Sequence, residues 1–348
     1  MPLTIDVDPD ASDDYMLDDN GSFVNGSFAI NNQWQDLRLE DLQQTTLLGQ
    51  GASGVVYKAL HRPTGKILAL KDISVFDAEK RKQIIKELQT LYSSSCPYLV
   101  AFYGAFYSDG SISIALEYME GGSLADVCRL SGSIPEGILS KIFYQVLQGL
   151  RYLHKDKHVV HRDLKPSNIL MNESGEFKIT DFGVSAEVDN TQGECATFVG
   201  TCTYMSPERL EGYKYSFASD IWAIGIAAAE CALGSFPFVK DNGTPVNSFW
   251  ELLSHIKTKE PPQLKTSQGF SPELCDFVNG CLKRNPRERV SVQNLLDHPF
   301  IKFYENRNVG YSQWVPHIMS LIEKDRVKTS TNSSNQMKIE NKLDLLNF

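Results

Sequence analysis

Two carboxylates, one amide and one lysine lie within a short stretch in the middle of the chain. Asp163, Lys165 and Asn168 follow one another closely, and Asp181 comes thirteen residues after Asn168. A hairpin is expected between them, over 169–180. Phosphoryl transfer needs a carboxylate that orients a hydroxyl group, oxygen ligands for a cation on the phosphates, and positive charge where negative charge develops. These four residues therefore indicate phosphoryl transfer.

Each half of this stretch is weak evidence when taken alone. The tripeptide His-Arg-Asp at 161–163 could occur by chance, and Asp-Phe-Gly at 181–183 could be an ordinary turn. Their order along the chain, with Lys165 and Asn168 at these offsets, favours a catalytic segment over a coincidence.

A glycine-rich segment lies upstream of this stretch. Gly49, Gly51 and Gly54 follow the spacing Gly-x-Gly-x-x-Gly, and glycines let the backbone approach a phosphate and present its N–H groups to it. Dinucleotide-binding proteins share this spacing, but there a helix follows the third glycine, whereas residues 55–57 here are strongly β-prone. The sequence therefore predicts a strand, a phosphate-binding loop and a second strand over 46–59.

Composition limits the classes of protein to which the chain can belong. Of its 348 residues, 42% are hydrophobic and 22% are charged, as in a globular protein with a sizeable core. A net charge of −9 disfavours a nucleic-acid-binding protein. The seven cysteines are scattered without a Cys-x-x-Cys pair, and no apolar signal segment opens the sequence. These features favour reduced thiols, in the cytoplasm or the nucleus, over a zinc site.

One apolar run, 221–233, needs to be distinguished from a membrane span. It is shorter than the ~20 residues that cross a bilayer, and it contains Glu230. We therefore expect a buried core helix there and no association with a membrane.

The beginning of the sequence differs in composition from the rest. Residues 1–37 carry eight aspartates and no lysine, arginine or glutamate. Such a segment cannot bury enough apolar surface to offset its ordering entropy, so we expect an acidic disordered arm over 1–40. Its scattered aromatic residues keep open the alternative that the arm packs on the folded body.

Two regions of different secondary structure follow the arm. The expected strands lie within 46–59 and over 67–71, 99–106 and 111–116, with one polar helix over 78–92. Residues 117–122 end the β pattern, and amphipathic spacing then predicts a helix over 139–154. The sequence therefore predicts an α+β protein with five antiparallel strands before this break and helices after it.

Over residues 45–303 the ordered motifs resemble those of eukaryotic protein kinases. The series comprises the glycine loop, Ala-Leu-Lys71, Glu87, His-Arg-Asp163, Asp-Phe-Gly, Ser-Pro-Glu208, Asp220 and Arg289. The resemblance implies a two-lobed kinase fold, with a small antiparallel β lobe that carries one main helix and ends in the hinge (45–120) and a large helical lobe (121–303). Asp220 is expected to cap the buried helix, and Glu208 is expected to pair with Arg289.

The resemblance also implies a role for each catalytic residue. Asp163 orients the substrate hydroxyl group, and Lys165 contacts the γ-phosphate. Asn168 and Asp181 bind Mg²⁺. The Lys-Pro-x-Asn form of the loop is similar to that of serine/threonine kinases rather than dedicated tyrosine kinases.

ATP is the nucleotide that the resemblance implies. Apolar residues of the strands would cover adenine, the backbone of Glu117 and Met119 would hydrogen-bond it, and Lys71 would hold the phosphates. Lys71 is expected to pair with Glu87, for which a surface pair with a neighbouring lysine is the alternative. The complete expected set of ATP-binding residues is Leu48, Gly49, Gln50, Gly51, Ala52, Ser53, Gly54, Val55, Val56, Ala69, Lys71, Glu87, Glu117, Met119 and Leu170.

A narrower resemblance lies in the activation loop. The segment Ala-Thr-Phe-Val-Gly-Thr-x-Thr-Tyr-Met-Ser-Pro-Glu-Arg at 196–209 resembles the MAP kinase kinases, whereas Ste20-like kinases generally have Trp-Met-Ala-Pro-Glu near its end. It implies a dual-specificity kinase that phosphorylates threonine and tyrosine in the activation loop of a downstream MAP kinase. An upstream MAP kinase kinase kinase would activate it on Thr191 and Thr197, which are spaced as in plant-type members, whereas Thr201 would bond within the catalytic loop. A Ste20-like serine/threonine kinase with other substrates and a non-catalytic kinase-fold scaffold are the alternatives.

The region 304–348 is expected to be an extension that contains one short helix. Its apolar face comprises Trp314, Val315, Ile318, Met319 and Ile322. This face resembles the helix by which MAP kinase kinases bind their upstream kinase, and packing on the large lobe is the equal alternative. The residues beyond it are polar and expected to be loose. The acidic arm lacks the basic cluster with which such kinases often dock their MAP kinase.

Overall fold

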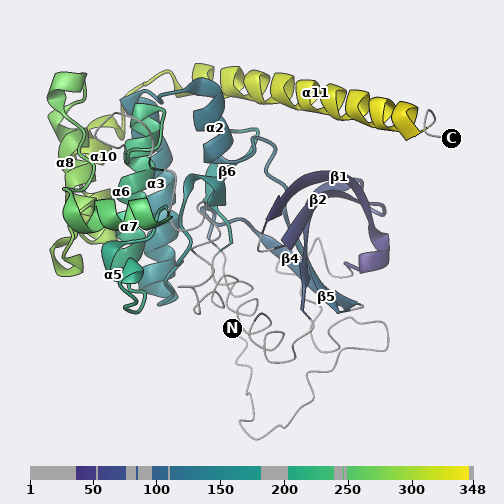
Figure 1. Ribbon diagram of the computed structural model, residues 1–348, viewed down its shortest axis with the longest axis horizontal. Helices are drawn as coiled ribbons and strands as arrows, with labels where there is room; N and C mark the ends of the chain where they lie inside the picture. Colours follow the sequence, from purple (N-terminus) through teal and green to yellow (C-terminus); the bar gives the residue numbers. More distant parts are fainter. Residues whose placement is uncertain are drawn as a thin grey trace, which may run out of the picture. The chain divides into compact units, whose positions relative to one another are not determined.

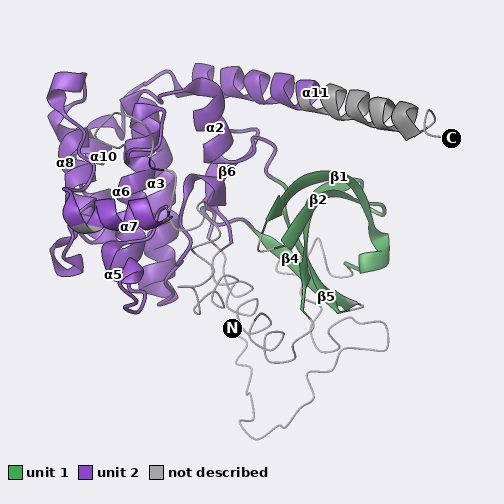
Figure 2. Ribbon diagram, viewed as in Figure 1, with its two compact units in different colours: residues 1–93, 101–118 green, residues 94–100, 119–348 purple. Residues whose placement is uncertain are grey.

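The computed structural model describes residues 37–51, 54–75, 84, 96–108, 110–181, 203–238, 246 and 249–344, with side chains as far as Lys328, apart from those of Ser108, Phe249 and Lys257. The chain forms two compact units, one of residues 1–93 with 101–118 and one of residues 94–100 with 119–348 (Figure 1 and Figure 2). Several predictions fall outside the described residues. These concern residues 1–36 of the arm, Glu87 with its helix, Ala52, Ser53, Thr191, Thr197 and Thr201.

The first unit contains a five-stranded antiparallel sheet in the order β1-β2-β3-β5-β4 (Figure 1). Its strands are β1 (Leu42–Gly51), β2 (Gly54–His61), β3 (Lys66–Ser74), β4 (Phe102–Ser108) and β5 (Ser111–Glu117), and a 3-10 turn, η1 (Leu39–Asp41), precedes them. The predicted five-stranded antiparallel region is confirmed. Strand β4 begins later than predicted because Tyr98 and Val100 belong to the second unit, where both form backbone hydrogen bonds with Ile179.

The side chains of the sheet alternate between two apolar clusters, as the period of a strand requires. Leu68 and Leu70 of β3 are buried with Ala59, Phe106 and Ala115 in one cluster. Ile112 and Ile114 of β5 belong to the other. Because Lys71 pairs in register with Ile114, it projects from the face opposite to Leu70.

The second unit is mainly helical (Figure 1). Its helices are α2 (Leu124–Ser131), α3 (Glu136–Arg151), α5 (Pro207–Leu210), α6 (Phe217–Leu233), α7 (Phe249–Thr258), α8 (Pro272–Cys281), α9 (Val292–Leu296), α10 (Pro299–Tyr304) and α11 (Tyr311–Asp344). A π turn, η2 (Tyr152–Asp156), follows α3, and the 3-10 turns are η3 (Pro166–Asn168), η5 (Thr266–Gln268) and η6 (Pro286–Glu288). The strands β6 (Ile169–Met171) and β7 (Phe177–Ile179) form an antiparallel hairpin. Together the two units confirm the predicted α+β fold class.

Helix α6 lies in the core of the second unit, as predicted for the apolar run. Nearly all of its residues from Ser219 to Ala232 are buried. A Cβ added at Gly225 would lie 2.6 Å from the Cβ of Cys281, so α8 packs directly on its backbone. Within the described ranges, no helix combines the length and the apolar character that a bilayer crossing requires.

Helix α11 is longer than predicted. It runs from Tyr311 to Asp344 rather than ending in a loose tail, because no glycine or proline follows Pro316 within this range. On its predicted apolar face, Val315, Ile318 and Ile322 are buried. The helix contacts α2 of the same unit. Of the two alternatives for this face, the structure therefore shows packing on the helical unit.

Candidate active site

Asp163, Lys165 and Asn168 form one hydrogen-bonded cluster before β6. Lys165 Nζ lies 2.9 and 2.8 Å from the two carboxylate oxygens of Asp163. Asn168 Nδ2 donates to the Asp163 carbonyl oxygen at 2.8 Å and to its Oδ2 at 3.0 Å. Pro166 begins the η3 turn that returns Asn168 toward Asp163. With its side chain 22% exposed, Asp163 is accessible to a substrate group while two donors hold its carboxylate.

The β6–β7 hairpin connects this cluster to Asp181. Its ladder starts at the pair of Ile169 and Ile179, and the N–H of Thr180 donates to the Asn168 carbonyl oxygen at 3.0 Å. Asp181 follows at once with a φ of 61°, a left-handed conformation that aspartate tolerates better than most residues. Asn168 and Asp181, the two expected cation ligands, therefore stand at the two ends of one short hairpin.

The buried ring of His161 links the two loops. Its Nε2 lies 3.0 Å from the Thr180 carbonyl oxygen, and the N–H of Asp163 donates to its Nδ1 at 3.3 Å. A neutral ring with its proton on Nε2 satisfies both contacts. His161 is not among the residues predicted for the site, although its position two residues before Asp163 was an available signal. Through these two contacts the His161 ring fixes the backbone next to Asp163 and next to Asp181.

Asp220 does not cap its own helix, and that prediction was wrong. The residue that caps α6 is Ser216. The Asp220 carboxylate instead accepts the N–H groups of His161 at 2.8 Å and Arg162 at 3.0 Å, and it lies 2.8 Å from His154 Nε2. The reason is that Asp220 faces inward from the buried helix toward a backbone turn that needs acceptors. Arg162 has a φ of 74°, so this carboxylate holds a conformation that is costly for a residue with a Cβ.

In the first unit, the glycine loop is a hairpin of β1 and β2, as predicted. The two strands pair as far as Gly51 with Gly54. A Cβ at Gly54 would collide with the carbonyl oxygen of Asp72, so the sheet itself requires this glycine. A Cβ at Gly49 or Gly51 would meet none of the described atoms within 4 Å. These two glycines leave bare backbone that a phosphate can approach.

Three of the expected nucleotide-binding residues of the sheet, Val56, Ala69 and Lys71, share one face, and Val55 points to the other. Lys71 pairs in register with Val56, and Ala69 lies two residues earlier on β3. Lys71 is only 3% exposed, whereas Leu48 on β1 is 41% exposed. Gln50 and Val55 pair beside the tip of the hairpin.

Some of the backbone groups expected to bind adenine already form hydrogen bonds within the protein. In the first unit, the N–H of Glu117 donates to the Ala101 carbonyl oxygen at 2.8 Å, so the Glu117 carbonyl is the group with which it could bind a base. In the second unit, the Met119 carbonyl oxygen accepts the N–H of Gly122 at 3.2 Å. The N–H of Met119 is therefore its candidate donor. Leu170, also in the second unit, is half-buried in β6.

Glu208 and Arg289 form the predicted buried ion pair. Arg289 donates to the two Glu208 carboxylate oxygens at 2.7 and 2.6 Å. It also donates to the Ala218 carbonyl oxygen at 2.8 Å. Burial by itself would raise the pKa of the Glu208 carboxyl, but its hydrogen bonds and the charge of Arg289 outweigh burial and lower that pKa. The pair joins α5 to the segment before α9.

The end of the activation segment is held by a contact that the sequence analysis missed. Tyr204 donates its hydroxyl hydrogen bond to Glu230 on α6. Burial, followed by the neighbouring Glu230 charge, raises the pKa of Tyr204. Burial also raises the pKa of Glu230, against the effect of the tyrosine hydrogen bond. The only available signal was an acidic residue inside an otherwise apolar helix.

Comparison with known proteins agrees with this geometry. Residues 42–301 match the family described as "Protein kinase domain". The chain is 49% identical over 274 residues to mitogen-activated protein kinase kinase 3 of Arabidopsis thaliana, which covers 78% of this chain but only 52% of that relative, about half its length. It is 43% identical over 335 residues to mitogen-activated protein kinase kinase 2 of the same plant, covering 90% of this chain and 92% of the relative. It is 38% identical to dual specificity mitogen-activated protein kinase kinase 1 of Dictyostelium discoideum, covering 80% and 56% of the two chains.

Proposed function

Because this chain belongs to the protein kinase family and, within it, to the MAP kinase kinases, we propose that it transfers the γ-phosphoryl group of ATP to a threonine and a tyrosine in the activation loop of a MAP kinase. The observation that carries the proposal is the hydrogen-bonded cluster of Asp163, Lys165 and Asn168. The name of the Dictyostelium relative includes dual specificity, which supports the choice of both residue types.

In this proposal Asp163 orients the attacking hydroxyl group and receives its proton. The substrate oxygen forms a bond to the γ-phosphorus while the bond to the leaving ADP oxygen breaks. Lys165 lies against Asp163 and supplies positive charge where the transferred group becomes most negative. Asn168 holds the carboxylate in place, so that little reorganisation is needed at the moment of transfer.

The residues present also fit ATP with a divalent cation, for which we propose Mg²⁺. Because the Asn168 amide nitrogen donates to Asp163, its amide oxygen is the atom that can face a cation, together with the Asp181 carboxylate. Oxygen donors suit Mg²⁺, which shields phosphate charge during transfer. The described part of the chain has no group of three His, Cys, Asp or Glu side chains arranged for a metal. A cation held by two residues would therefore also need phosphate oxygens, as a nucleotide-bound Mg²⁺ does.

We further propose that an upstream kinase activates the protein on Thr191 and Thr197. Arg162 is an exposed positive group beside Asp163. A phosphate on Thr197 adds about −1.5 to −2 charges, enough to form charge-assisted hydrogen bonds with such a group. The names of the relatives favour this MAP kinase kinase assignment over a Ste20-like kinase.

The test uses the full chain with Thr191→Asp and Thr197→Asp, incubated with Mg·ATP and inactive MAP kinases. Mass spectrometry of the substrates should find phosphate on both the threonine and the tyrosine of the activation loop. The matched control carries Asp163→Asn in the same background and should transfer none. Phosphate on serine and threonine of unrelated proteins only would favour the Ste20-like alternative. Nucleotide binding without any transfer would favour a scaffold.

A further inference from the structure

The start of α11 fits directly against the turn of the catalytic hairpin. Tyr311 donates its hydroxyl hydrogen bond to the Gly175 carbonyl oxygen. Burial raises the pKa of Tyr311 to about 12, so this hydroxyl keeps its proton at neutral pH. Gly175 has a φ of 80°, and a Cβ there would collide with Val315 and lie 3.3 Å from the Tyr311 ring. Only glycine lets the hairpin turn and the helix approach so closely.

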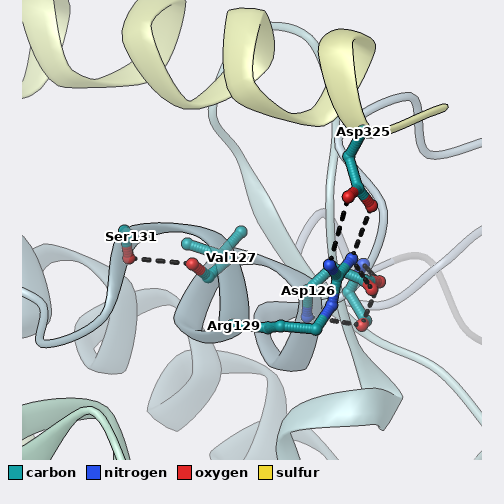
Figure 3. Close-up of polar contacts among 6 residues, drawn as sticks. Asp126, Val127, Arg129, Ser131 and Asp325 are labelled. Carbon is teal, nitrogen blue, oxygen red and sulfur yellow. Dashed lines mark hydrogen bonds and ion pairs between the residues drawn. The ribbon is translucent and has the colours of Figure 1, made fainter. Parts of the chain in front are cut away.

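Further along, α11 contacts α2 and the segment that follows β5. The guanidinium of Arg129 on α2 donates to the two carboxylate oxygens of Asp325 at 2.8 and 3.3 Å (Figure 3). Arg326 donates to the Glu120 carbonyl oxygen at 2.8 Å. Arg129 also reaches Asp126, which belongs to the capping box of α2. Exposed polar contacts contribute little to stability by themselves, so the buried face of α11 attaches the helix to its unit. The polar contacts determine which neighbouring groups, Arg129 and Glu120, the helix keeps in position.

The segment Glu120–Gly122 is also bonded to the catalytic hairpin. The N–H of Gly121 donates to the Met171 carbonyl oxygen at 2.7 Å, and the N–H of Met171 donates to the Gly122 carbonyl oxygen at 2.8 Å. The N–H of Glu173 donates to the Glu120 carboxylate at 3.3 Å. The segment Glu120–Gly122 is therefore hydrogen-bonded both to β6 and to Arg326 of α11. It directly follows Met119, while the hairpin carries Asn168 and Asp181 at its ends.

We propose that α11 is a strap that holds Glu120–Gly122 on the catalytic hairpin, and that Arg326 and Asp325 are positioning residues for nucleotide binding. Arg326 acts through the Glu120 carbonyl, and Asp325 acts through Arg129 and α2. A segment that is already ordered loses less conformational freedom when a nucleotide binds beside it, so the contacts increase affinity without touching the nucleotide. The inference rests on the proposed ATP-dependent activity.

The test measures the dissociation constant of Mg·ADP by titration calorimetry, on full-length chains at a temperature where each is shown to be folded. Arg326→Ala should raise this constant about threefold to tenfold. Arg326→Lys keeps a donor and should recover most of the affinity. Asp325→Ala should weaken binding in the same direction, and Asp325→Asn, which keeps an acceptor for Arg129, should recover most of the affinity. The matched control is Lys324→Ala, which removes an exposed charge from the same helix and should leave the constant unchanged.

A second readout separates positioning from general stability. In the Thr191→Asp, Thr197→Asp background, Arg326→Ala should raise the KM for ATP while kcat at saturating ATP stays within about twofold. Unchanged constants for Arg326→Ala and Asp325→Ala in a protein whose parent binds Mg·ADP would overturn the strap and leave the proposed function standing. Equal weakening by Lys324→Ala would also overturn it. A parent chain that neither binds Mg·ADP nor transfers phosphate would instead refute the proposed function.

Discussion

At the scale of single residues, the Asp163 side chain is held on both of its oxygens. Lys165 contacts both, and Asn168 adds a second donor to Oδ2. Charge-assisted hydrogen bonds of this kind are stronger than neutral ones, so they keep the carboxylate oriented. The same two neighbours are those expected to contact the γ-phosphate and the cation. Positioning and chemistry therefore depend on the same few side chains.

Replacing Asp163 by asparagine should abolish phosphoryl transfer and leave a folded protein. The amide cannot receive the hydroxyl proton, and loss of one interaction made in the transition state costs about 3–4 kcal/mol, or a factor of several hundred in kcat. Turnover measured with a MAP kinase substrate, together with the melting temperature, checks this. The control is Ser167→Ala, an exposed position of the same loop. Near-normal turnover in Asp163→Asn would remove Asp163 from the proposed mechanism.

At the scale of elements, two buried carboxylates connect parts of the helical unit that are distant in sequence. Asp220 joins α6 to the backbone before Asp163, and Glu208 joins α5 to Arg289. Leaving a buried charged or polar group without its partner costs free energy. Each of these two carboxylates therefore stabilises the contact between the two segments that it connects.

Replacing Asp220 by alanine should lower the free energy of unfolding by about 3–5 kcal/mol, because two backbone N–H groups and His154 lose their common acceptor. Asp220→Asn keeps one acceptor oxygen and should cost less. Urea denaturation of the three proteins measures the series. At a temperature where Asp220→Asn is folded, its kcat should fall more than its KM rises, because Arg162 and Asp163 shift together. Equal stability of alanine and wild-type proteins would show that the turn does not depend on this carboxylate.

The Glu208–Arg289 pair predicts a pH dependence of stability. Since the pKa of Glu208 is lowered in the folded state, its contribution is fully present above the ordinary value of 4.5 and is lost as the pH falls through the folded pKa. Glu208→Gln should therefore be less stable than wild type by about 3 kcal/mol at neutral pH, and the difference should shrink below about pH 4.5. Denaturation curves between pH 7 and pH 3.5 measure it. A difference that stayed constant over this range would assign the stabilisation to hydrogen bonding alone.

At the scale of the whole molecule, each compact unit is extended by residues outside the resemblance to kinases. Leu37 and Leu39 pack against the apolar cluster of the first unit that contains Leu68 and Leu70. In the second unit, α11 covers the turn of the catalytic hairpin and contacts α2 (Figure 1). The folded body therefore begins before the first strand and continues beyond α10.

Two truncations should separate the acidic arm from the folded body. Deleting residues 1–36 should leave basal catalysis and the melting temperature nearly unchanged, because the arm lacks the periodicity of a packed element. Deleting residues 1–41 also removes Leu37 and Leu39, and should lower stability by about 2–3 kcal/mol through lost apolar burial. Thermal unfolding and an ATP affinity measurement compare the two. A large loss of stability in the shorter deletion would mean that the arm packs on the kinase body.

Much of the catalytic cluster could be predicted because its contacts are local. Lys165 and Asn168 are two and five residues from Asp163, so a short turn suffices to bring them together. The glycine hairpin is also local, since β-prone residues on both sides of Gly51 and Gly54 leave one way to pair the strands. The order of the motifs along the chain was sufficient to predict the family and the α+β fold class. In each case residues that are close in sequence restrict the backbone strongly enough to determine the local structure.

Contacts between distant residues were decided only by the tertiary structure. The acceptor for the His161 N–H lies 59 residues away on α6, and Glu120 is 206 residues from Arg326. For this reason the hydrogen-bond donors predicted for Asp220 were wrong, and the predicted end of α11 was too early. No local pattern specifies such pairs, because they depend on how buried helices pack and on which backbone groups remain without acceptors after packing. The residue types and their local spacing indicated the chemistry, and only packing showed what holds the site in place.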